Sequence, residues 1–277
     1  MHAEPDHSFE YRQTPQGNLQ LHLFEARGRQ AGGPAPAIVF FFGGGWTTGS
    51  PEQFFPQCAY LSSRGMVACS AEYRVHSRHR TTPYEAVEDA KEAVRWLRQQ
   101  ATSLGIDPTR IAAGGGSAGG HLAAAAALVP GLEAPATTGG PATLPNALVL
   151  FNPALVLDWE RWKTTPARLA EIREQFEGRD PKRISPHMYI RPDAPPTLIL
   201  HGTDDTTVPV ETARGFCTAM RQTGNRCELA AYEGETHGFF NPERGSGQCF
   251  RETLRTVDRF LQSLGYLSGP ETVDRWA

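Results

Sequence analysis

A serine at position 117 stands in a pattern that suits nucleophilic chemistry. Residues 114–121 read Gly-Gly-Gly-Ser-Ala-Gly-Gly-His, which places Gly-x-Ser-x-Gly between an apolar, strand-like run and an alanine-rich, helix-like one. A serine on such a tight strand-to-helix turn adopts strained backbone angles and presents its hydroxyl for attack on an acyl carbon. Gly115 and Gly119 are small enough for the strand and the helix to pass closely. Because the motif arises by chance in roughly one chain in ten of this length, the surrounding sequence must support it.

A glycine run upstream is the second group with a chemical use. Residues 37–42 form a continuous apolar stretch, and residues 42–46 read Phe-Gly-Gly-Gly-Trp. Unhindered backbone N–H groups in such a run can point at the oxyanion that develops when a hydroxyl attacks an ester carbonyl. A flexible loop is the alternative interpretation, but the position directly after a buried strand and before Ser117 favours an oxyanion loop.

The elements that must position these groups alternate between strands and helices. Residues 9–12 and 19–24 predict an opening antiparallel pair, and apolar runs predict buried strands at residues 37–42, 67–71, 111–113, 147–151 and 197–200. Apolar residues at helical spacing predict helices over residues 84–99, 209–222 and 250–264. This alternation implies a mostly parallel sheet with helices on both faces, in a single α/β domain of residues 1–277.

A serine turn on such a sheet predicts the α/β-hydrolase fold, in which the catalytic residues follow the chain order serine, acid, histidine. Of the nine histidines, only His237 comes after the last strong strand, in a loop between strand-like residues 227–232 and the C-terminal helix. It is therefore the expected general base. The loop after residues 197–200 supplies two candidate acids, Asp204 and Asp205.

These motifs together resemble the hormone-sensitive-lipase-like and acetylxylan/feruloyl-esterase-like branch of the α/β-hydrolase serine esterases, over about residues 37–264. Residues 201–209 are similar to the His-Gly-x-x-Asp-x-x-Val-Pro pattern of this fold, which favours Asp205 as the acid and leaves Asp204 as a capping residue. The resemblance also implies which backbone N–H groups line the oxyanion hole: those of Gly44, Gly45 and Ala118.

Two positions depart from the lipase-like pattern. Phe42 stands where that group usually has His before the glycines, and Gly116 stands where it usually has Asp before the serine. Neither is a position of the catalytic triad, so the departures bear on the branch and on the substrates inferred from it.

The resemblance implies a serine carboxylester hydrolase that needs no cofactor or metal. His237 would take the Ser117 proton during attack on the ester, Asp205 would orient the imidazolium, and water would then release the acyl group. Short acyl esters, acetyl above all, carried on a carbohydrate, are the expected substrates. A feruloyl or aryl esterase, a small peptidase of prolyl-oligopeptidase type and a non-catalytic binder on this scaffold are the alternatives.

The expected pocket is small and open. Only about eight residues precede the first predicted strands, so any lid must come from residues 152–194, which include a helix-like stretch at residues 166–176. A pocket without a deep apolar lid disfavours long acyl chains. The candidate pocket residues are Trp46, Trp159, Trp162 and Phe239, and each tryptophan either stacks on a sugar or aromatic ring or belongs to the core.

Composition excludes several other classes of function. The net charge is −3 and no stripe of Lys and Arg is present, so a nucleic-acid partner is not expected. No apolar run approaches the roughly 20 residues of a membrane span, and residues 1–9 are polar, so a cytoplasmic location is expected, or a periplasmic or secreted one if a leader has been removed. Five widely spaced cysteines without Cys-x-x-Cys predict neither disulfides nor zinc. Nothing in the sequence predicts an oligomeric state.

Overall fold

The computed structural model describes residues 3–27, 33–133, 143–158, 170, 173–244 and 247–275, and in this part of the chain eight strands form one sheet. The strands are β1 (His7–Thr14), β2 (Gly17–Phe24), β3 (Ala35–Phe41), β4 (Val67–Ala71), β5 (Ile106–Gly116), β6 (Ala147–Phe151), β7 (Thr197–Gly202) and β8 (Cys227–Tyr232). Their order across the sheet is β1-β2-β4-β3-β5-β6-β7-β8. β2 pairs antiparallel with β1 and β4, and all other neighbours are parallel. The predicted mostly parallel sheet is confirmed.

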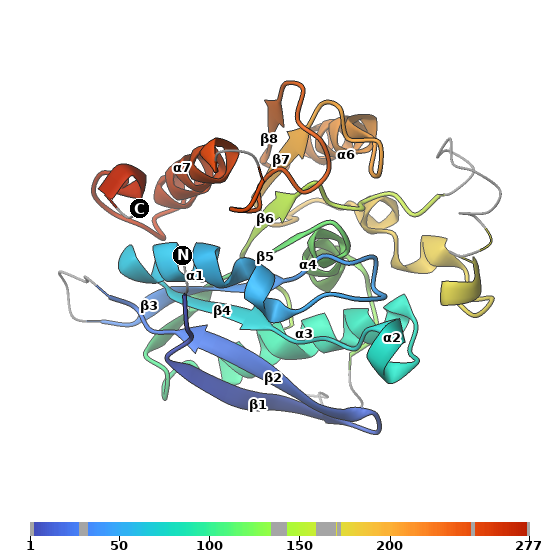
Figure 1. Ribbon diagram of the computed structural model, residues 1–277, viewed down its shortest axis with the longest axis horizontal. Helices are drawn as coiled ribbons and strands as arrows, with labels where there is room; N and C mark the ends of the chain where they lie inside the picture. The colour runs from blue at the N-terminus through green and yellow to red at the C-terminus, as the bar shows by residue number, and fades with distance from the viewer. Residues whose placement is uncertain are drawn as a thin grey trace.

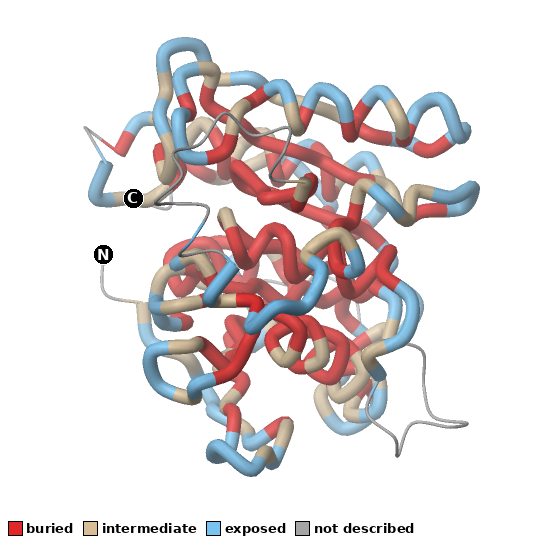
Figure 2. Tube along the Cα trace, turned by 90° about the vertical axis from the view of Figure 1, so that its right-hand side faces the viewer, coloured by how far each residue is buried: buried red, intermediate tan, exposed pale blue. Residues whose placement is uncertain are grey.

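Helices cover both faces of this sheet (Figure 1). On one face lie α1 (Phe55–Ser63) and α7 (Gln248–Ser263), and on the other lie α3 (Pro83–Gln99), α4 (Ala118–Leu128) and α6 (Val210–Gln222). Figure 2 shows the buried residues gathered along the sheet and on the inner sides of the helices. Every residue of β3 and β6 is buried, which explains why these strands have continuous apolar sequences. Within the described ranges, no helix is both long enough and apolar enough to cross a membrane.

Local sequence accounts for the start of helix α3 but not for that of strand β5. Helix α3 begins at Pro83, one residue before the predicted range, because Thr82 and Glu85 form a capping box and Pro83 occupies the first turn. Strand β5 instead begins at Ile106, earlier than the predicted residue 111. The polar residues 107–110 hide this start in the sequence, and a register shift on the paired strand β3 accommodates the irregular segment.

The segment of residues 152–194 is described only in part. Trp159, Trp162 and most of the helix predicted for residues 166–176 lie outside the described residues, so their roles stay predictions. The described part contains the 3₁₀ helices η3 (Pro181–Ile184) and η4 (Pro186–Tyr189). The Ser185 hydroxyl accepts a hydrogen bond of 2.9 Å from the Leu157 N–H, which ties the two described parts of this segment together.

Candidate active site

Ser117 lies at the sharp turn between β5 and α4. Its backbone angles are φ 54° and ψ −117°, a conformation that residues with a Cβ rarely adopt. Only glycine fits at the close approaches beside it. A Cβ on Gly119 would lie 1.9 Å from the Phe41 carbonyl oxygen, and a Cβ on Gly115 would lie 2.5 Å from the backbone of Gly119. The turn therefore holds the Ser117 side chain above the carboxyl end of the sheet, at the N-terminus of α4.

His237 stands between Ser117 and Asp205. Its Nε2 atom lies 2.9 Å from the Ser117 Oγ, and its Nδ1 atom lies 2.7 Å from Oδ2 of Asp205. An ionised carboxylate only accepts hydrogen bonds, so Nδ1 carries the proton and Nε2 is left to accept from the serine hydroxyl. Loops after β7 and β8 supply Asp205 and His237, and thus three residues far apart in the sequence form one continuous relay.

The environment of Asp205 keeps it ionised. Burial raises the pKa of this carboxyl, but hydrogen bonds from His201 and His237 and from the Val208 N–H outweigh burial and hold the pKa well below its usual range. The backbone N–H groups of Thr207 and Val208 both donate to Oδ1 at 2.9 Å. The neighbouring Asp204 is exposed and contacts the Thr203 hydroxyl instead, so Asp205 is the carboxylate that faces His237.

The glycine run after β3 borders the same site. Among the described residues, the backbone N–H groups of Gly44, Gly45 and Ala118 donate to no protein acceptor. Gly44 and Gly45 have φ values of 125° and 60°, and a Cβ on Gly44 would lie 2.2 Å from the Thr48 carbonyl oxygen. Ala118 opens α4, where the first N–H groups have no partner inside the helix. Donors of this kind are available to a developing negative charge beside Ser117.

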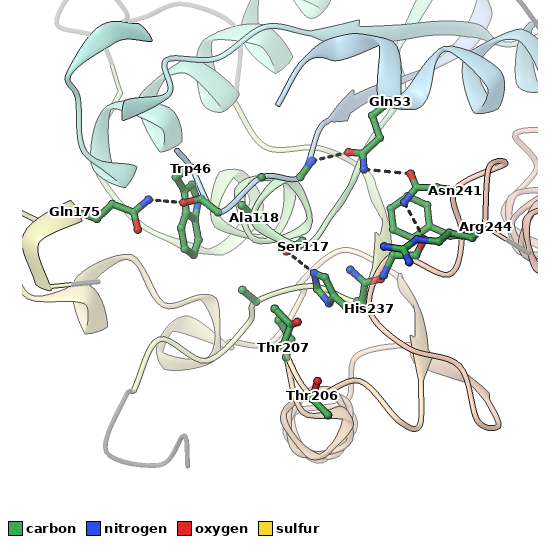
Figure 3. A pocket seen from close by; sticks show the side chains of 18 residues that line it. Trp46, Gln53, Ser117, Ala118, Gln175, Thr206, Thr207, His237, Asn241 and Arg244 are labelled. Carbon is green, nitrogen blue, oxygen red and sulfur yellow. Dashed lines mark hydrogen bonds between the residues drawn. The ribbon is translucent and has the colours of Figure 1, made fainter. Parts of the chain in front are cut away.

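Two carboxamide side chains hold the ends of this loop. The Gly43 N–H donates to Oε1 of Gln53 at 2.6 Å, and Nε2 of Gln175 donates to the Gly45 carbonyl oxygen. Figure 3 shows Gln53 and Gln175 on opposite sides of the cleft. With both ends of the glycine run held, the free N–H groups between them keep a fixed direction.

Gln53 also links this loop to the His237 loop. Its Nε2 atom donates to Oδ1 of Asn241 at 3.1 Å, and the Asn241 Nδ2 atom donates to the Gly238 carbonyl oxygen at 2.8 Å. The N–H group of the same residue, Gly238, donates to Oδ1 of Asn152 at 3.1 Å. A line of side-chain amides therefore connects the glycine loop with the residue that follows His237 (Figure 3).

These groups surround a cleft of about 590 Å³. Besides Ser117, His237 and the glycine loop, its lining includes Trp46, Gln53, Asn152, Ala154, Gln175, Thr206, Thr207, Val208, Phe240, Asn241 and Arg244. In the described part of the chain, no group of three or more His, Cys, Asp or Glu side chains is arranged to hold a metal ion.

The predicted pocket residues divide between the cleft and the core. Trp46 lines the cleft but is only 6% exposed, and its ring packs against His121 and Phe176. It therefore forms part of the wall of the cleft, and its stacking on a substrate ring stays a prediction. The prediction for Phe239 is wrong. Gly238 has a φ of 80° and turns the chain so that Phe239 packs on Tyr232 in the core, whereas the next residue, Phe240, lines the cleft.

Sequence reasoning missed the polar lining of the cleft. Asn241 and Arg244 follow His237 within the same loop, so proximity in the sequence could have indicated them. Gln53 and Gln175 carry no such signal, because only the folded chain brings them to the glycine loop.

Comparison with known proteins shows which family the chain belongs to. The sequence model of the BD-FAE family matches residues 26–220. The probable carboxylic ester hydrolase LipM of Mycobacterium tuberculosis is 34% identical over 210 residues, which are 70% of this chain and 47% of LipM. An acetylxylan esterase of Xylanibacter ruminicola is 30% identical over 83% of this chain and 44% of its own length. The chain thus spans about half the length of these curated relatives.

A solved structure covers more of the molecule. Esterase 2 of Thermogutta terrifontis is 46% identical, and the match covers 95% of this chain and 96% of that one with a TM-score of 0.88. The same esterase has been solved with propionate and with butyrate bound. This similarity over nearly the whole chain agrees with the α/β-hydrolase fold predicted from the sequence. By its sequence and its fold, the chain belongs to the BD-FAE family and has the α/β-hydrolase fold.

Proposed function

We propose that this protein hydrolyses short-chain carboxylic esters, acetyl esters above all, through Ser117, His237 and Asp205. The relay from the Ser117 Oγ to His237 at 2.9 Å and from His237 to Asp205 at 2.7 Å carries the proposal. His237 removes the serine proton as Oγ attacks the ester carbonyl, and the ionised Asp205 stabilises the resulting imidazolium. The N–H groups of Gly44, Gly45 and Ala118 take the oxyanion.

The second half of the reaction uses the same groups. The imidazolium of His237 protonates the departing alcohol, which leaves an acyl group on Ser117. A water molecule in the cleft then loses a proton to His237 and attacks the acyl carbon, and the serine leaves with a proton returned by His237. Apart from the ester and water, each step uses only these side chains and N–H groups.

The cleft favours a small acyl group and a polar alcohol. Trp46 is held firmly at one end by its contacts with His121 and Phe176, so it limits the room for an extended chain. The similar Thermogutta esterase, whose structures contain propionate and butyrate, supports a short acyl group. Side-chain amides and hydroxyls dominate the remaining lining, and these groups suit a carbohydrate alcohol; they are Gln53, Asn152, Gln175, Thr206, Thr207 and Asn241. The acetylxylan esterase among the relatives supports the same choice.

The test compares initial rates on p-nitrophenyl acetate, butyrate, octanoate and palmitate with acetate release from acetylated xylo-oligosaccharide. We expect the specificity constant to be largest for acetate or butyrate and acetate to be released from the sugar. Ser117→Ala should lower turnover by a factor on the order of 10⁵ to 10⁶, while Ser103→Ala, which changes an exposed serine outside the cleft, should have no effect. A maximum at octanoate would contradict the short acyl group, and near-parental activity of Ser117→Ala would contradict the nucleophile.

A further inference from the structure

Arg244 places a positive charge at the edge of the catalytic cleft. It lines the cleft that contains Ser117 and also an adjoining groove of about 700 Å³. Among the residues that the structure describes, no hydrogen bond or ion pair involves its guanidinium group. Figure 3 shows this side chain beside Asn241 and on the same side of the cleft as His237. An arginine without a partner in a substrate cleft is available to a ligand.

No carboxylate in the cleft offsets this charge. The lining of the Ser117 cleft contains no Asp or Glu side chain in the described part of the chain, and Asp205 lies behind His237, to which it is hydrogen-bonded. Two acidic residues, Glu52 and Glu243, line the outer groove. Burial raises the pKa of the Glu52 carboxyl, but a hydrogen bond from the Ser50 hydroxyl and the charge of Arg78 help to lower it. Arg244 is not among the groups that affect this pKa. Among the described residues that line the inner cleft, Arg244 therefore supplies the permanent charge.

The position of Arg244 relative to His237 indicates which part of a substrate it meets. A Cβ built on Gly238, the residue after His237, would lie 3.9 Å from the Arg244 Nη2 atom. His237 must reach the leaving oxygen to protonate the departing alcohol. A group attached to that alcohol extends along the His237 side of the cleft, whereas Trp46 and Gln175 stand on the opposite side (Figure 3).

We propose that Arg244 binds a carboxylate on the alcohol part of the ester, so that the enzyme prefers acyl esters of hydroxy acids or of acidic sugars over neutral esters of the same size. The guanidinium group forms two parallel hydrogen bonds with a carboxylate, a geometry that an ammonium group does not reproduce. This proposal rests on the proposed esterase function and adds the charge of the alcohol to it.

The test uses two substrates of nearly equal shape, 4-acetoxybenzoate and 4-acetoxybenzamide, which differ in charge at the far end of the alcohol. The specificity constants are measured for the parent, Arg244→Gln and Arg244→Lys, with Arg214→Gln as a matched control, since Arg214 is exposed on α6 and lines neither cavity. We expect Arg244→Gln to lower the ratio of the two specificity constants, benzoate over benzamide, about five- to tenfold. This is a small effect for a hydrogen bond between charged groups, because Arg244 is open to solvent. Arg244→Lys should restore only part of it, and Arg214→Gln should leave it unchanged.

Added salt and a second pair of substrates distinguish the ways in which the proposal can fail. Added salt should lower the ratio in the parent and have little effect in Arg244→Gln, because screening weakens only the charged contact. An unchanged ratio in Arg244→Gln overturns the proposal while the esterase function stands. If Arg244→Gln instead affects monomethyl succinate relative to methyl succinamate, the carboxylate belongs to the acyl side and the assignment to the alcohol is wrong. If the parent hydrolyses neither these esters nor p-nitrophenyl acetate, the esterase function itself fails.

Discussion

Acidification should destabilise this protein through one buried histidine that supports the cleft. His121 on α4 is fully buried. Its Nε2 atom lies 2.7 Å from the Ile184 carbonyl oxygen and therefore carries the proton, while Nδ1 accepts a hydrogen bond of 3.3 Å from the Trp46 indole N–H. Burial lowers the pKa of His121 to about 4, although the hydrogen bond to Ile184 opposes this shift. A second proton on Nδ1 would face the indole N–H and break the contact that fixes Trp46 in the cleft wall.

The size and sign of the effect follow from the two pKa values. In the unfolded chain the pKa of His121 returns to the ordinary histidine value of 6.5, so between about pH 6.5 and pH 4 the unfolded state binds more protons than the native state. The stabilisation is complete above the unfolded pKa and is lost as the pH falls toward the folded one. The difference between the two pKa values corresponds to roughly 3 kcal/mol in all, of which roughly 2 kcal/mol is already lost at about pH 5.

Urea unfolding followed by circular dichroism at a series of pH values measures this loss. The parent is compared with His121→Gln and with His7→Gln, a control whose side chain is 51% exposed. The parent and His7→Gln should lose about 2 kcal/mol between about pH 8 and pH 5, whereas His121→Gln should show a much flatter profile. The lowered pKa of Asp205 also makes the protein less stable as the pH falls, but this loss occurs only below the usual pKa range of a carboxyl group. If the free energy of unfolding depends on pH equally in His121→Gln and in the parent, the reasoning is refuted. If His121→Gln does not fold, an NMR titration of the parent replaces this comparison, and a His121 that is protonated at pH 6 would refute the reasoning.

Two substitutions in neighbouring glutamines should have opposite effects. Gln53→Met removes the hydrogen bonds to the Gly43 N–H and to Asn241. We therefore expect kcat/KM for p-nitrophenyl acetate to fall about tenfold and the free energy of unfolding to fall by about 1–2 kcal/mol. Parental kinetics in this variant would show that the backbone alone holds the glycine loop. Gln57→Met should raise the free energy of unfolding by about 1 kcal/mol, because both polar atoms of this buried amide lack a partner among the described residues. Gln57→Met should keep parental kcat/KM, since Gln57 does not line the cleft, and chemical denaturation with steady-state kinetics checks both variants.

The strands and the serine turn were predictable because their causes are local. A strand that is buried on both faces is mostly apolar, and the turn at Ser117 admits only glycine at positions 115 and 119. Both features can therefore be recognised in short stretches of sequence. The orientation of Phe239 was not predictable in this way. Neighbouring aromatic residues at positions 239 and 240 are equivalent in a sequence, and the left-handed conformation of Gly238 decides which of them faces the cleft.

The contacts that fix the glycine loop after β3 come from residues far apart in the chain. Gln53 meets Asn241 across 188 positions, and Gln175 reaches the glycine run from the segment after β6. Glutamine and asparagine are common on protein surfaces, so neither composition nor spacing distinguishes these residues from solvated ones. Their use becomes visible only when the sheet brings the loop after β3 and the loop after β8 to the same edge.

The two departures from the lipase-like pattern, Phe42 and Gly116, both allow aromatic rings to pack beside the site. The Phe42 ring stacks on Tyr73 with centroids 4.1 Å apart, and the Tyr73 hydroxyl donates to the Phe42 carbonyl oxygen at 2.8 Å. A side chain at Gly116 would lie 2.5 Å from the Phe240 ring, so the glycine makes room for a phenylalanine that also packs on Phe151. At both positions apolar rings occupy the space beside the glycine loop and Ser117 where the pattern has ionisable groups. Because Phe42 and Gly116 carry no ionisable side chain, the charge at these two positions does not change with pH.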